Sequence, residues 1–387
     1  QIKTYICDKM KHITLLLLSL IVMTGCTTFR SIRMGSPSVD TYLNFALDTI
    51  SGYDTIPTVL ISSPDRNPYF ECSKFTGRRF NSETIGEYFA RVRGNGALLI
   101  VRNDTILLEE YYGNFSQLSP SNIFSVSKSL TSLLCGIAVD EGYLHVDDPV
   151  TKYIPELATC DPLFSRLTVE HLLDMRTGLD FKEDYGWNPL SDMAKLYYGD
   201  NVVTRFKKLH FKETPGKSYY YNSMATALLG VVVERAVSRP FAAYMQEKVW
   251  KQLDMEADAF VSLDDPKHRQ AKAYGGIVTN VRDLAKIGRL YINGGMYGKK
   301  RIVSNEWIVR STHSTLDNQA YSYGWNNIIA MVDDKEQVTP RFFAIGLYGQ
   351  ILFCDPDQNL IFVTLGEKKD CEYHLLFDDL CTLLQSE

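Results

Sequence analysis

Residues 124–128 read Phe124-Ser125-Val126-Ser127-Lys128, the only SxxK pattern in the 387-residue chain. Apolar residues recur at helical spacing from Val126 to Glu141, and Gly142 follows as a stop, so the pattern predicts a helix that begins at the motif. Residues three apart share a helix face, which lets Lys128 reach the Ser125 hydroxyl. The first turn also offers free N–H groups where an oxyanion would develop. A buried, neutral lysine could take the serine proton, so the stretch favours a serine nucleophile.

The motif has a simpler alternative, in which Ser125 caps the helix and Lys128 is solvated. Other catalytic patterns are missing from the sequence. There is no GxSxG and no HExxH, and Gly216-Lys217-Ser218 is not a P-loop because position 211 is Phe. The seven histidines are scattered. We therefore expect neither a metal nor an organic cofactor.

A second stretch, residues 215–223 (PGKSYYYNS), precedes an apolar helix predicted over Ala225–Val237. A tyrosine here could carry protons if a neighbouring lysine cation lowered the pKa of its phenol. The chain contains 23 tyrosines, so a packing role is the alternative for any one of them.

A third stretch, Gly346-Leu347-Tyr348-Gly349-Gln350, ends a predicted strand. Glycines at a strand end let a ligand approach the backbone closely. The N–H of Leu347 could then be an oxyanion donor beside the N–H of Ser125. A plain hairpin bend is the alternative.

Strand and helix signals occupy both ends of the chain, and the middle is mostly helical. Residues 97–102 and 105–111 predict a hairpin, and residues 341–345, 351–354 and 360–365 predict strands. This order predicts an α/β (α+β) fold, in which helices flank an antiparallel sheet and an all-helical lobe is inserted. We expect one catalytic domain over 57–387, with a sheet lobe at about 57–150 and 271–387 and a helical lobe at about 151–270. A groove between such lobes is a usual place for an active site.

The N-terminus carries a targeting pattern. Residues 13–23 (ITLLLLSLIVM) are apolar but too few to span a bilayer, Lys9 and Lys11 precede them, and Thr24-Gly25-Cys26 follows. The ending resembles a bacterial lipobox. We expect residues 1–26 to be a lipoprotein signal peptide ending at a lipidated Cys26, residues 27–56 to be a tether, and the protein to be a periplasm-facing membrane lipoprotein. A buried core helix is the alternative.

The charge and cysteine content limit which partners and disulfides we expect. The formal net charge is −5 and no basic block is visible, so a nucleic-acid partner is not expected. Beyond Cys7 and Cys26 the chain has six of its eight cysteines. Six cysteines allow 15 pairings, among which the sequence does not choose, and packing as small apolar residues is the default.

Together these residues resemble the β-lactamase-related serine hydrolases, which include class C β-lactamases, DD-peptidases and family VIII carboxylesterases. The resemblance runs in order from about residue 97 to residue 365, and it includes residues 142–150 (GYLHVDDPV) and 167–179 (LTVEHLLDMRTGL). The tyrosine block aligns without gaps if Tyr221 takes the family's tyrosine position; Tyr220 gives a literal Tyr-x-Asn but breaks that register.

The resemblance implies roles for individual residues. Ser125 would be the nucleophile, Lys128 its base and Tyr221 a proton relay. The remaining implied residues would bind the oxyanion or the substrate: Ser125, Leu347, Gly346 and Ser223.

Two departures from the family pattern affect the expected substrate. Ser223 stands where the family usually has Asn, and it offers no carboxamide. Gly346-Leu347-Tyr348 replaces the family's Lys-Thr-Gly or His-x-Gly strand, so the group that faces a substrate carboxylate is missing. The segment resembles the 6-aminohexanoate-dimer hydrolase and esterase branch.

We therefore expect a serine hydrolase that cleaves a small-molecule ester or amide, or a peptide, through an acyl-enzyme on Ser125. One alternative is a DD-peptidase or β-lactamase acting on cell-wall peptides or penicillins. Another, of a different class, is a sensor or binding protein that becomes acylated and does not turn over.

Overall fold

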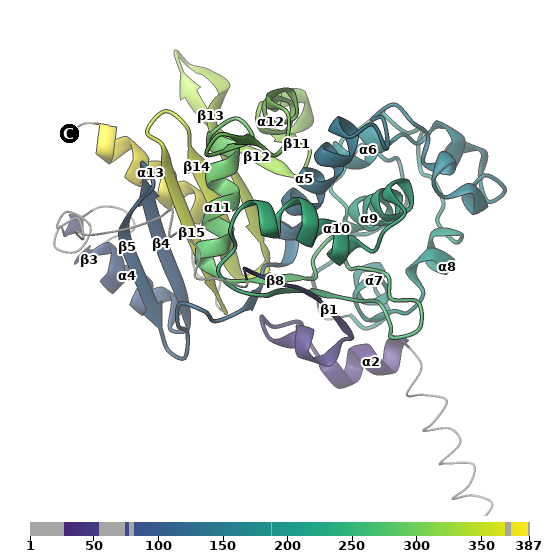
Figure 1. Cartoon of the computed structure of the whole chain (residues 1–387), viewed down its shortest axis with the longest axis horizontal. Coiled ribbons are helices and arrows are strands. Elements are labelled where there is room, and N and C mark those ends of the chain that lie inside the picture. The colour runs from purple at the N-terminus through teal and green to yellow at the C-terminus, as the bar shows by residue number, and fades with distance from the viewer. Residues whose placement is uncertain (1–26, 54–73, 77–80, 187, 368–372, 386–387) are drawn as a thin grey trace, which may run out of the picture.

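The computed structural model describes residues 27–53, 74–76, 81–186, 188–367 and 373–385. A seven-stranded antiparallel sheet with helices on both faces stands beside a lobe made mainly of helices (Figure 1). This architecture confirms the predicted fold class. The expected signal peptide, residues 1–26, lies outside the described residues. Within the described ranges, no helix has both the length and the apolar character needed to cross a membrane.

The large sheet joins the two ends of the chain. β4 (Gly96–Arg102) pairs with β15 (Leu360–Gly366), with Leu99 opposite Val363. The strand order is β11-β12-β13-β14-β15-β4-β5. The other members are β5 (Thr105–Tyr112), β11 (Tyr321–Ser322), β12 (Trp325–Val332), β13 (Lys335–Gly346) and β14 (Gln350–Asp355).

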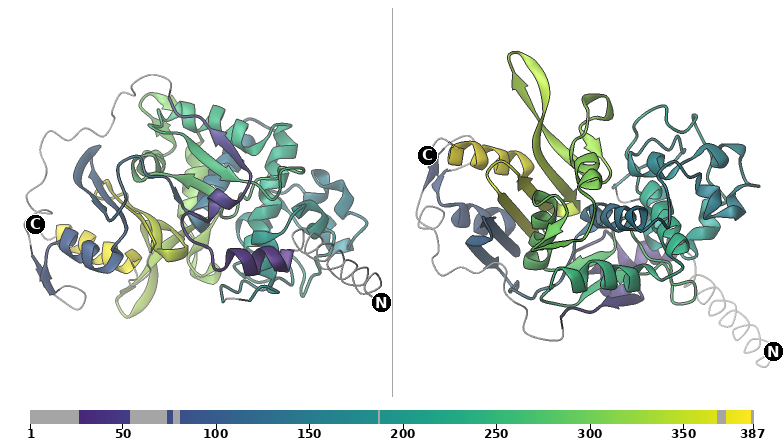
Figure 2. Two further views of the ribbon diagram at one scale, coloured as in Figure 1. Left: turned by 90° about the horizontal axis from the view of Figure 1, so that it is seen from below. Right: turned by 45° about the horizontal axis from the view of Figure 1, so that its top comes forward.

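Alternation along the central strands divides the core into two layers. On β4, Leu99 belongs to the main core, whereas Leu98 and Ile100 belong to a second apolar cluster on the opposite face. The main core includes α5 (Ser127–Asp140) and α11 (Val281–Ile292), and the second cluster includes α4 (Ile85–Arg93) and α13 (Tyr373–Gln385). Figure 2 shows α4 and α13 together on one side of the sheet. Each fully buried Leu or Ile stabilises this packing by about 1.5–3 kcal/mol.

Two helices begin at residues whose side chains cap the first turn. Thr168 accepts a hydrogen bond from the His171 N–H at 3.3 Å, and α6 (Val169–Leu173) begins after it. Asn280 accepts from the Asp283 N–H at 2.9 Å at the start of α11. The other α-helices are α2 (Thr27–Met34), α7 (Asp192–Tyr198), α8 (Val202–Phe206), α9 (Ser223–Val237), α10 (Phe241–Lys248) and α12 (Asn305–Thr312).

A small second sheet differs from the expectation. It is a four-stranded sheet in the order β1-β7-β8-β6, built from β1 (Leu47–Ile50), β7 (Ala259–Ser262), β8 (Ile277–Thr279) and β6 (Ser121–Asn122). β7 lies inside residues 151–270, so the prediction that this lobe is entirely helical is wrong at its end. Strands of two to four residues are too short to show an alternating pattern in the sequence.

The segment expected to be a tether is also part of this packed structure as far as residue 53. α2 packs on α7, and β1 pairs with β7. The remaining short elements are the strands β2 (Phe75–Thr76), β3 (Asn81–Glu83), β9 (Met296–Tyr297) and β10 (Lys300–Arg301), and the 3₁₀-helices η1 (Thr41–Asn44), η2 (Phe124–Val126), η3 (Val150–Lys152), η4 (Pro155–Leu157), η5 (Pro162–Arg166), η6 (Trp250–Gln252), η7 (Leu316–Asn318) and η8 (Leu347–Gly349).

Candidate active site

Ser125 lies in η2, immediately before α5. Phe124 has φ of 45°, in the left-handed region that a non-glycine residue rarely adopts. Hydrogen bonds hold this turn, because the Phe124 N–H donates to Asn122 Oδ1 at 3.0 Å and the Val126 N–H donates to Ile123 O at 3.1 Å. Within residues 121–130 only Ser125 is partly exposed. The strained turn therefore leaves the Ser125 hydroxyl accessible, while the rest of the segment is buried.

Polar contacts fix α5 between the two lobes. Ser127 Oγ accepts from the Ile277 N–H at 3.2 Å, Ser129 Oγ donates to Gly324 O at 2.6 Å, and Thr131 Oγ1 donates to Ala273 O at 2.8 Å. These three hydroxyls are buried and hydrogen bonded, which makes displacement of the helix costly. The helix start thus holds Ser125 in a defined position.

Lys128 lies directly against Ser125. Its Nζ is 2.9 Å from Ser125 Oγ and donates to Tyr274 O at 2.9 Å, and the side chain is buried. Burial lowers the pKa of Lys128 to about 8, while the negative charge of Glu183 acts to raise it. A neutral amine that donates one hydrogen to Tyr274 O keeps its lone pair available for the Ser125 proton.

The structure distinguishes the two candidate tyrosines. Lys128 Nζ lies 5.1 Å from the centre of the Tyr221 ring. The Tyr220 ring faces Lys212 instead, with Nζ 3.6 Å from its centre. The condition considered for a tyrosine in this stretch, a pKa lowered by a neighbouring lysine cation, is not met, because burial raises the pKa of Tyr221 above its ordinary value. Tyr221 is therefore a protonated phenol that can donate a hydrogen, and not a phenolate.

Glu183 is a site residue that the sequence analysis did not identify. Its carboxylate accepts from the Ser223 N–H at 2.7 Å and from Ser223 Oγ at 2.6 Å, and it also accepts from the Tyr185 hydroxyl. Ser223 is the first residue of α9, so Glu183 sits at the positive end of that helix. No spacing pattern in the sequence marks it, since an acid in an aromatic loop is common.

The end of β13 closes the site on its other side. A β-carbon on Gly346 would lie 2.3 Å from Ile123 O and 3.2 Å from the Ser125 N atom, so the two backbones are in close contact there. Leu347 follows in η8 and lines the same cavity as Ser125. Tyr348 has φ of 61°, and its ring packs edge-on against Phe124 at 5.7 Å. This contact brings together the two backbone segments expected to bind an oxyanion.

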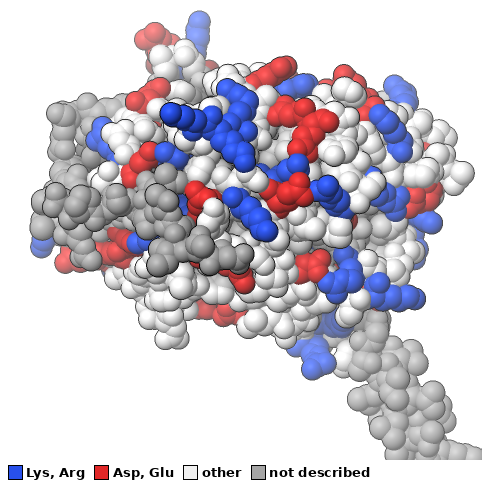
Figure 3. All heavy atoms as spheres, in the orientation of Figure 1, with Lys and Arg blue, Asp and Glu red and all other residues white. Residues whose placement is uncertain are grey.

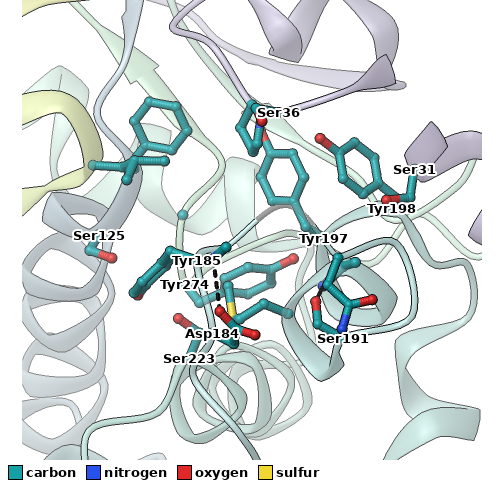
Figure 4. A pocket seen from close by; sticks show the side chains of 18 of the residues that line it. Ser31, Ser36, Ser125, Asp184, Tyr185, Ser191, Tyr197, Tyr198, Ser223 and Tyr274 are labelled. Atoms are coloured by element: carbon teal, nitrogen blue, oxygen red, sulfur yellow. Dashed lines mark hydrogen bonds between the residues drawn. The ribbon is translucent and has the colours of Figure 1, made fainter. Parts of the chain in front are cut away.

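A cavity of about 210 Å³ opens beside Ser125. Figure 4 shows tyrosine rings along it, with Ser223 and Asp184 on one side and Ser31 and Ser36 on another. Among the described lining residues only Asp184 carries a charge, and none is Lys or Arg. The cavity is therefore mainly apolar and aromatic.

The described residues also bear on metal binding, cysteine pairing and surface charge. The described ranges contain no group of three His, Cys, Asp or Glu that could hold a metal ion. Cys135, Cys160, Cys354 and Cys381 are free thiols; Cys26, Cys72 and Cys371 lie outside the described residues. Figure 3 shows acidic and basic side chains intermixed on the described part of one face.

A serine–lysine pair at the start of a helix, set between an antiparallel sheet and an inserted helical lobe, defines a class of serine hydrolases that act through an acyl-enzyme. The family model described as Beta-lactamase matches residues 82–370. The chain belongs to this family, and it is a serine hydrolase, as the sequence predicted.

Relatives agree with this assignment. The 6-aminohexanoate-dimer hydrolase of Paenarthrobacter ureafaciens is 27% identical over 302 residues, which cover 71% of this chain and 73% of that protein. The solved structure described as "Putative 6-aminohexanoate-dimer hydrolase from Bacillus anthracis" has a TM-score of 0.76 at 18% identity and covers 91% of this chain and 96% of that one. An octameric penicillin-binding protein homologue from Pyrococcus abyssi has a TM-score of 0.58 at 20% identity, with 76% and 74% covered.

Proposed function

We propose that the protein hydrolyses small uncharged esters or amides, with Ser125 as the nucleophile. Lys128 removes the Ser125 proton while Oγ bonds to the substrate carbonyl carbon. The N–H groups of Ser125 and Leu347 stabilise the resulting oxyanion. Tyr221 donates its proton to the departing oxygen or nitrogen and regains one from the Lys128 ammonium, which leaves an acyl-Ser125 ester and a neutral lysine.

Water then hydrolyses the acyl-enzyme. Lys128, in contact with Tyr221, takes a proton from a water molecule as the water oxygen bonds to the acyl carbon. The bond from the acyl carbon to Ser125 Oγ breaks, and Oγ receives the proton from Lys128. Acid product and free enzyme result, with no need for a metal or an organic cofactor.

The observation that carries the proposal is the 2.9 Å contact between a buried Lys128, whose pKa is about 8, and a partly exposed Ser125. The substrate class follows from the cavity, where no described lining residue offers a cation to a substrate carboxylate. The relative named 6-aminohexanoate-dimer hydrolase supports cleavage of an amide, but its named substrate carries a carboxylate, so the preference for an uncharged substrate rests on the cavity alone.

The nucleophile is tested by labelling with a fluorophosphonate. Ser125→Ala should abolish labelling and turnover of an aryl ester. Ser132→Ala is the matched control, since it removes a buried hydroxyl without a hydrogen-bond partner from the same helix. Labelling of Ser125→Ala at the wild-type level would refute the assignment.

The substrate is tested with a panel of aryl esters, short amides, nitrocefin and D-Ala-D-Ala peptides. Faster turnover of the neutral esters or amides supports the proposal. Faster turnover of nitrocefin or the peptides would favour the β-lactamase or DD-peptidase alternative. A burst of one equivalent of product with no steady state would favour the acylated sensor.

We further propose that the protein is a lipoprotein anchored through Cys26 to a bacterial membrane, facing the periplasm. The support is the apolar run at 13–23 with lysines before it and Thr24-Gly25-Cys26 after it. Cys26→Ala should block incorporation of radioactive palmitate and release the protein from the membrane fraction. Cys160→Ala, at an exposed free thiol, is the control and should do neither.

A further inference from the structure

The chain's own N-terminal segment forms part of the cavity beside Ser125. Four of its residues line that cavity: Ser31, Gly35, Ser36 and Pro37. Ser31 is buried on α2, and the other three follow the helix. Figure 4 shows Ser31 and Ser36 on the side of the cavity near Tyr197 and Tyr198, away from Ser125 and Ser223. The segment therefore limits the cavity at a distance from the nucleophile.

Two tyrosine hydroxyls fasten this segment to the catalytic lobes. Tyr198 donates to Gly35 O at 2.5 Å, and Tyr348 donates to Pro37 O. Tyr348 directly follows Leu347, the expected oxyanion donor. The position of residues 35–37 is thus linked through a single side chain to the backbone that borders Ser125.

The start of α2 is fastened as well. Arg205 donates to Thr27 Oγ1 at 2.7 Å, and Arg30 forms an ion pair with Asp200 at 3.3 Å. These contacts lie on the same helical lobe that carries Tyr198. The segment is held at both ends, as a fixed wall requires.

The chemistry of the cavity defines what can bind inside this wall. Aromatic side chains dominate it, and they provide flat apolar surface with a polar edge. Asp184 is the charged group among the described lining residues, and it would repel a substrate carboxylate. At about 210 Å³ the cavity is smaller than the roughly 300–1,000 Å³ of typical small-molecule sites. A compact, uncharged, apolar group fits these properties.

We propose that residues 31–37 are a specificity-determining wall, which limits the length of the apolar, uncharged substrate group that the cavity accepts. The inference rests on the proposed function of Ser125, because only a reaction at that residue makes this cavity the substrate site. Ser36 is the best position to test it, since it lines the cavity but is exposed, so that a change there does not disturb the core.

The test compares Ser36→Leu and Ser36→Trp with Ile32→Trp. Ile32 is an exposed residue of α2 that does not line the cavity, so its variant is the matched control. One substrate series holds the p-nitrophenyl group constant and lengthens the acyl chain from acetyl to octanoyl. The other holds acetyl constant and lengthens the alcohol. Together the series show which side of the ester occupies the cavity.

In one of the two series, kcat/KM for the longest ester should fall at least tenfold in Ser36→Trp, and less in Ser36→Leu. For p-nitrophenyl acetate it should change less than threefold, and Ile32→Trp should behave as wild type. Equal losses for short and long esters, or no loss in either series, would overturn the proposal. Fluorophosphonate labelling of each variant verifies that Ser125 still reacts, so failure of the wall is distinguishable from failure of the nucleophile assignment.

Charge gives an independent readout on the unmodified protein. The wild type should prefer p-nitrophenyl butyrate over the mono-p-nitrophenyl ester of succinic acid by at least tenfold in kcat/KM. Asp184→Asn should reduce this preference severalfold. A wild-type preference for the succinate ester would contradict an uncharged substrate group.

Discussion

The Nζ atom of Lys128 lies 5.1 Å from the centre of the Tyr221 ring. Tyr220, one residue earlier, is partly exposed and faces Lys212. Because a proton relay contributes roughly 10²–10⁴-fold to rate, Tyr221→Phe should lower kcat by about 100-fold or more, and Tyr220→Phe should leave it within about threefold. The loss should be greater for an anilide than for a nitrophenyl ester, since an amine leaving group needs the proton. Equal losses in the two variants would contradict the assignment of Tyr221.

The pH dependence should follow the proton on Lys128. Burial lowers its pKa to about 8, so the amine is mainly protonated below that pH and mainly neutral above it. Only the neutral form can accept the Ser125 proton, and kcat/KM should therefore rise with pH and level off above about 8. In Lys128→Arg, kcat/KM should fall by at least about 1,000-fold at every pH up to 10, because guanidinium does not release its proton in this range and cannot act as the base. A wild-type profile that falls through pH 8 would exclude Lys128 as the base.

Features with a local cause could be predicted from the sequence. Thr168 and Asn280 each supply a side-chain oxygen to the first turn of the helix that follows, and both helices begin there. The three-residue interval between Ser125 and Lys128 likewise depends on one helix turn, and the two side chains meet as expected. Short-range geometry of this kind requires no knowledge of the tertiary fold.

Features that depend on distant contacts could not be predicted. Glu183 reaches Ser223 across 40 residues of sequence, and Tyr348 reaches Pro37 across 311. No periodicity marks either pair. The raised pKa of Tyr221 could not be predicted either, because its main cause is burial, which depends on the tertiary fold. The short strand β1 had too few residues to give a pattern.

Glu183 should influence the pH at which kcat/KM rises to its plateau. Its negative charge favours the ammonium form of Lys128, so its removal lowers the pKa of Lys128 further. In Glu183→Gln the rise of kcat/KM should therefore shift to lower pH, while the amide still holds Ser223 through a hydrogen bond. Asp184→Asn is the matched control, since the neighbouring carboxylate accepts from the Gly186 N–H and is not among the charges acting on Lys128. An unshifted profile, or a shift to higher pH, would show that Glu183 acts only as a structural residue.

The close contact between Gly346 and the Ser125 turn should make this glycine indispensable. A methyl group on Gly346 would meet Ile123 O at 2.3 Å, well inside contact distance, and must push the end of β13 away from Ser125. If the N–H groups of Ser125 and Leu347 bind the oxyanion, Gly346→Ala separates them and should lower kcat by about 10²–10³-fold, the loss expected for one oxyanion donor. Gly275→Ala is the control, because a methyl group at this other cavity residue would be no closer than 3.8 Å to the Phe124 backbone. Circular dichroism and the melting temperature establish whether each variant is folded. Since Ser125 and Lys128 remain in place, Gly346→Ala should still react slowly with a fluorophosphonate. Unchanged kcat in a folded Gly346→Ala would show that the oxyanion is bound elsewhere.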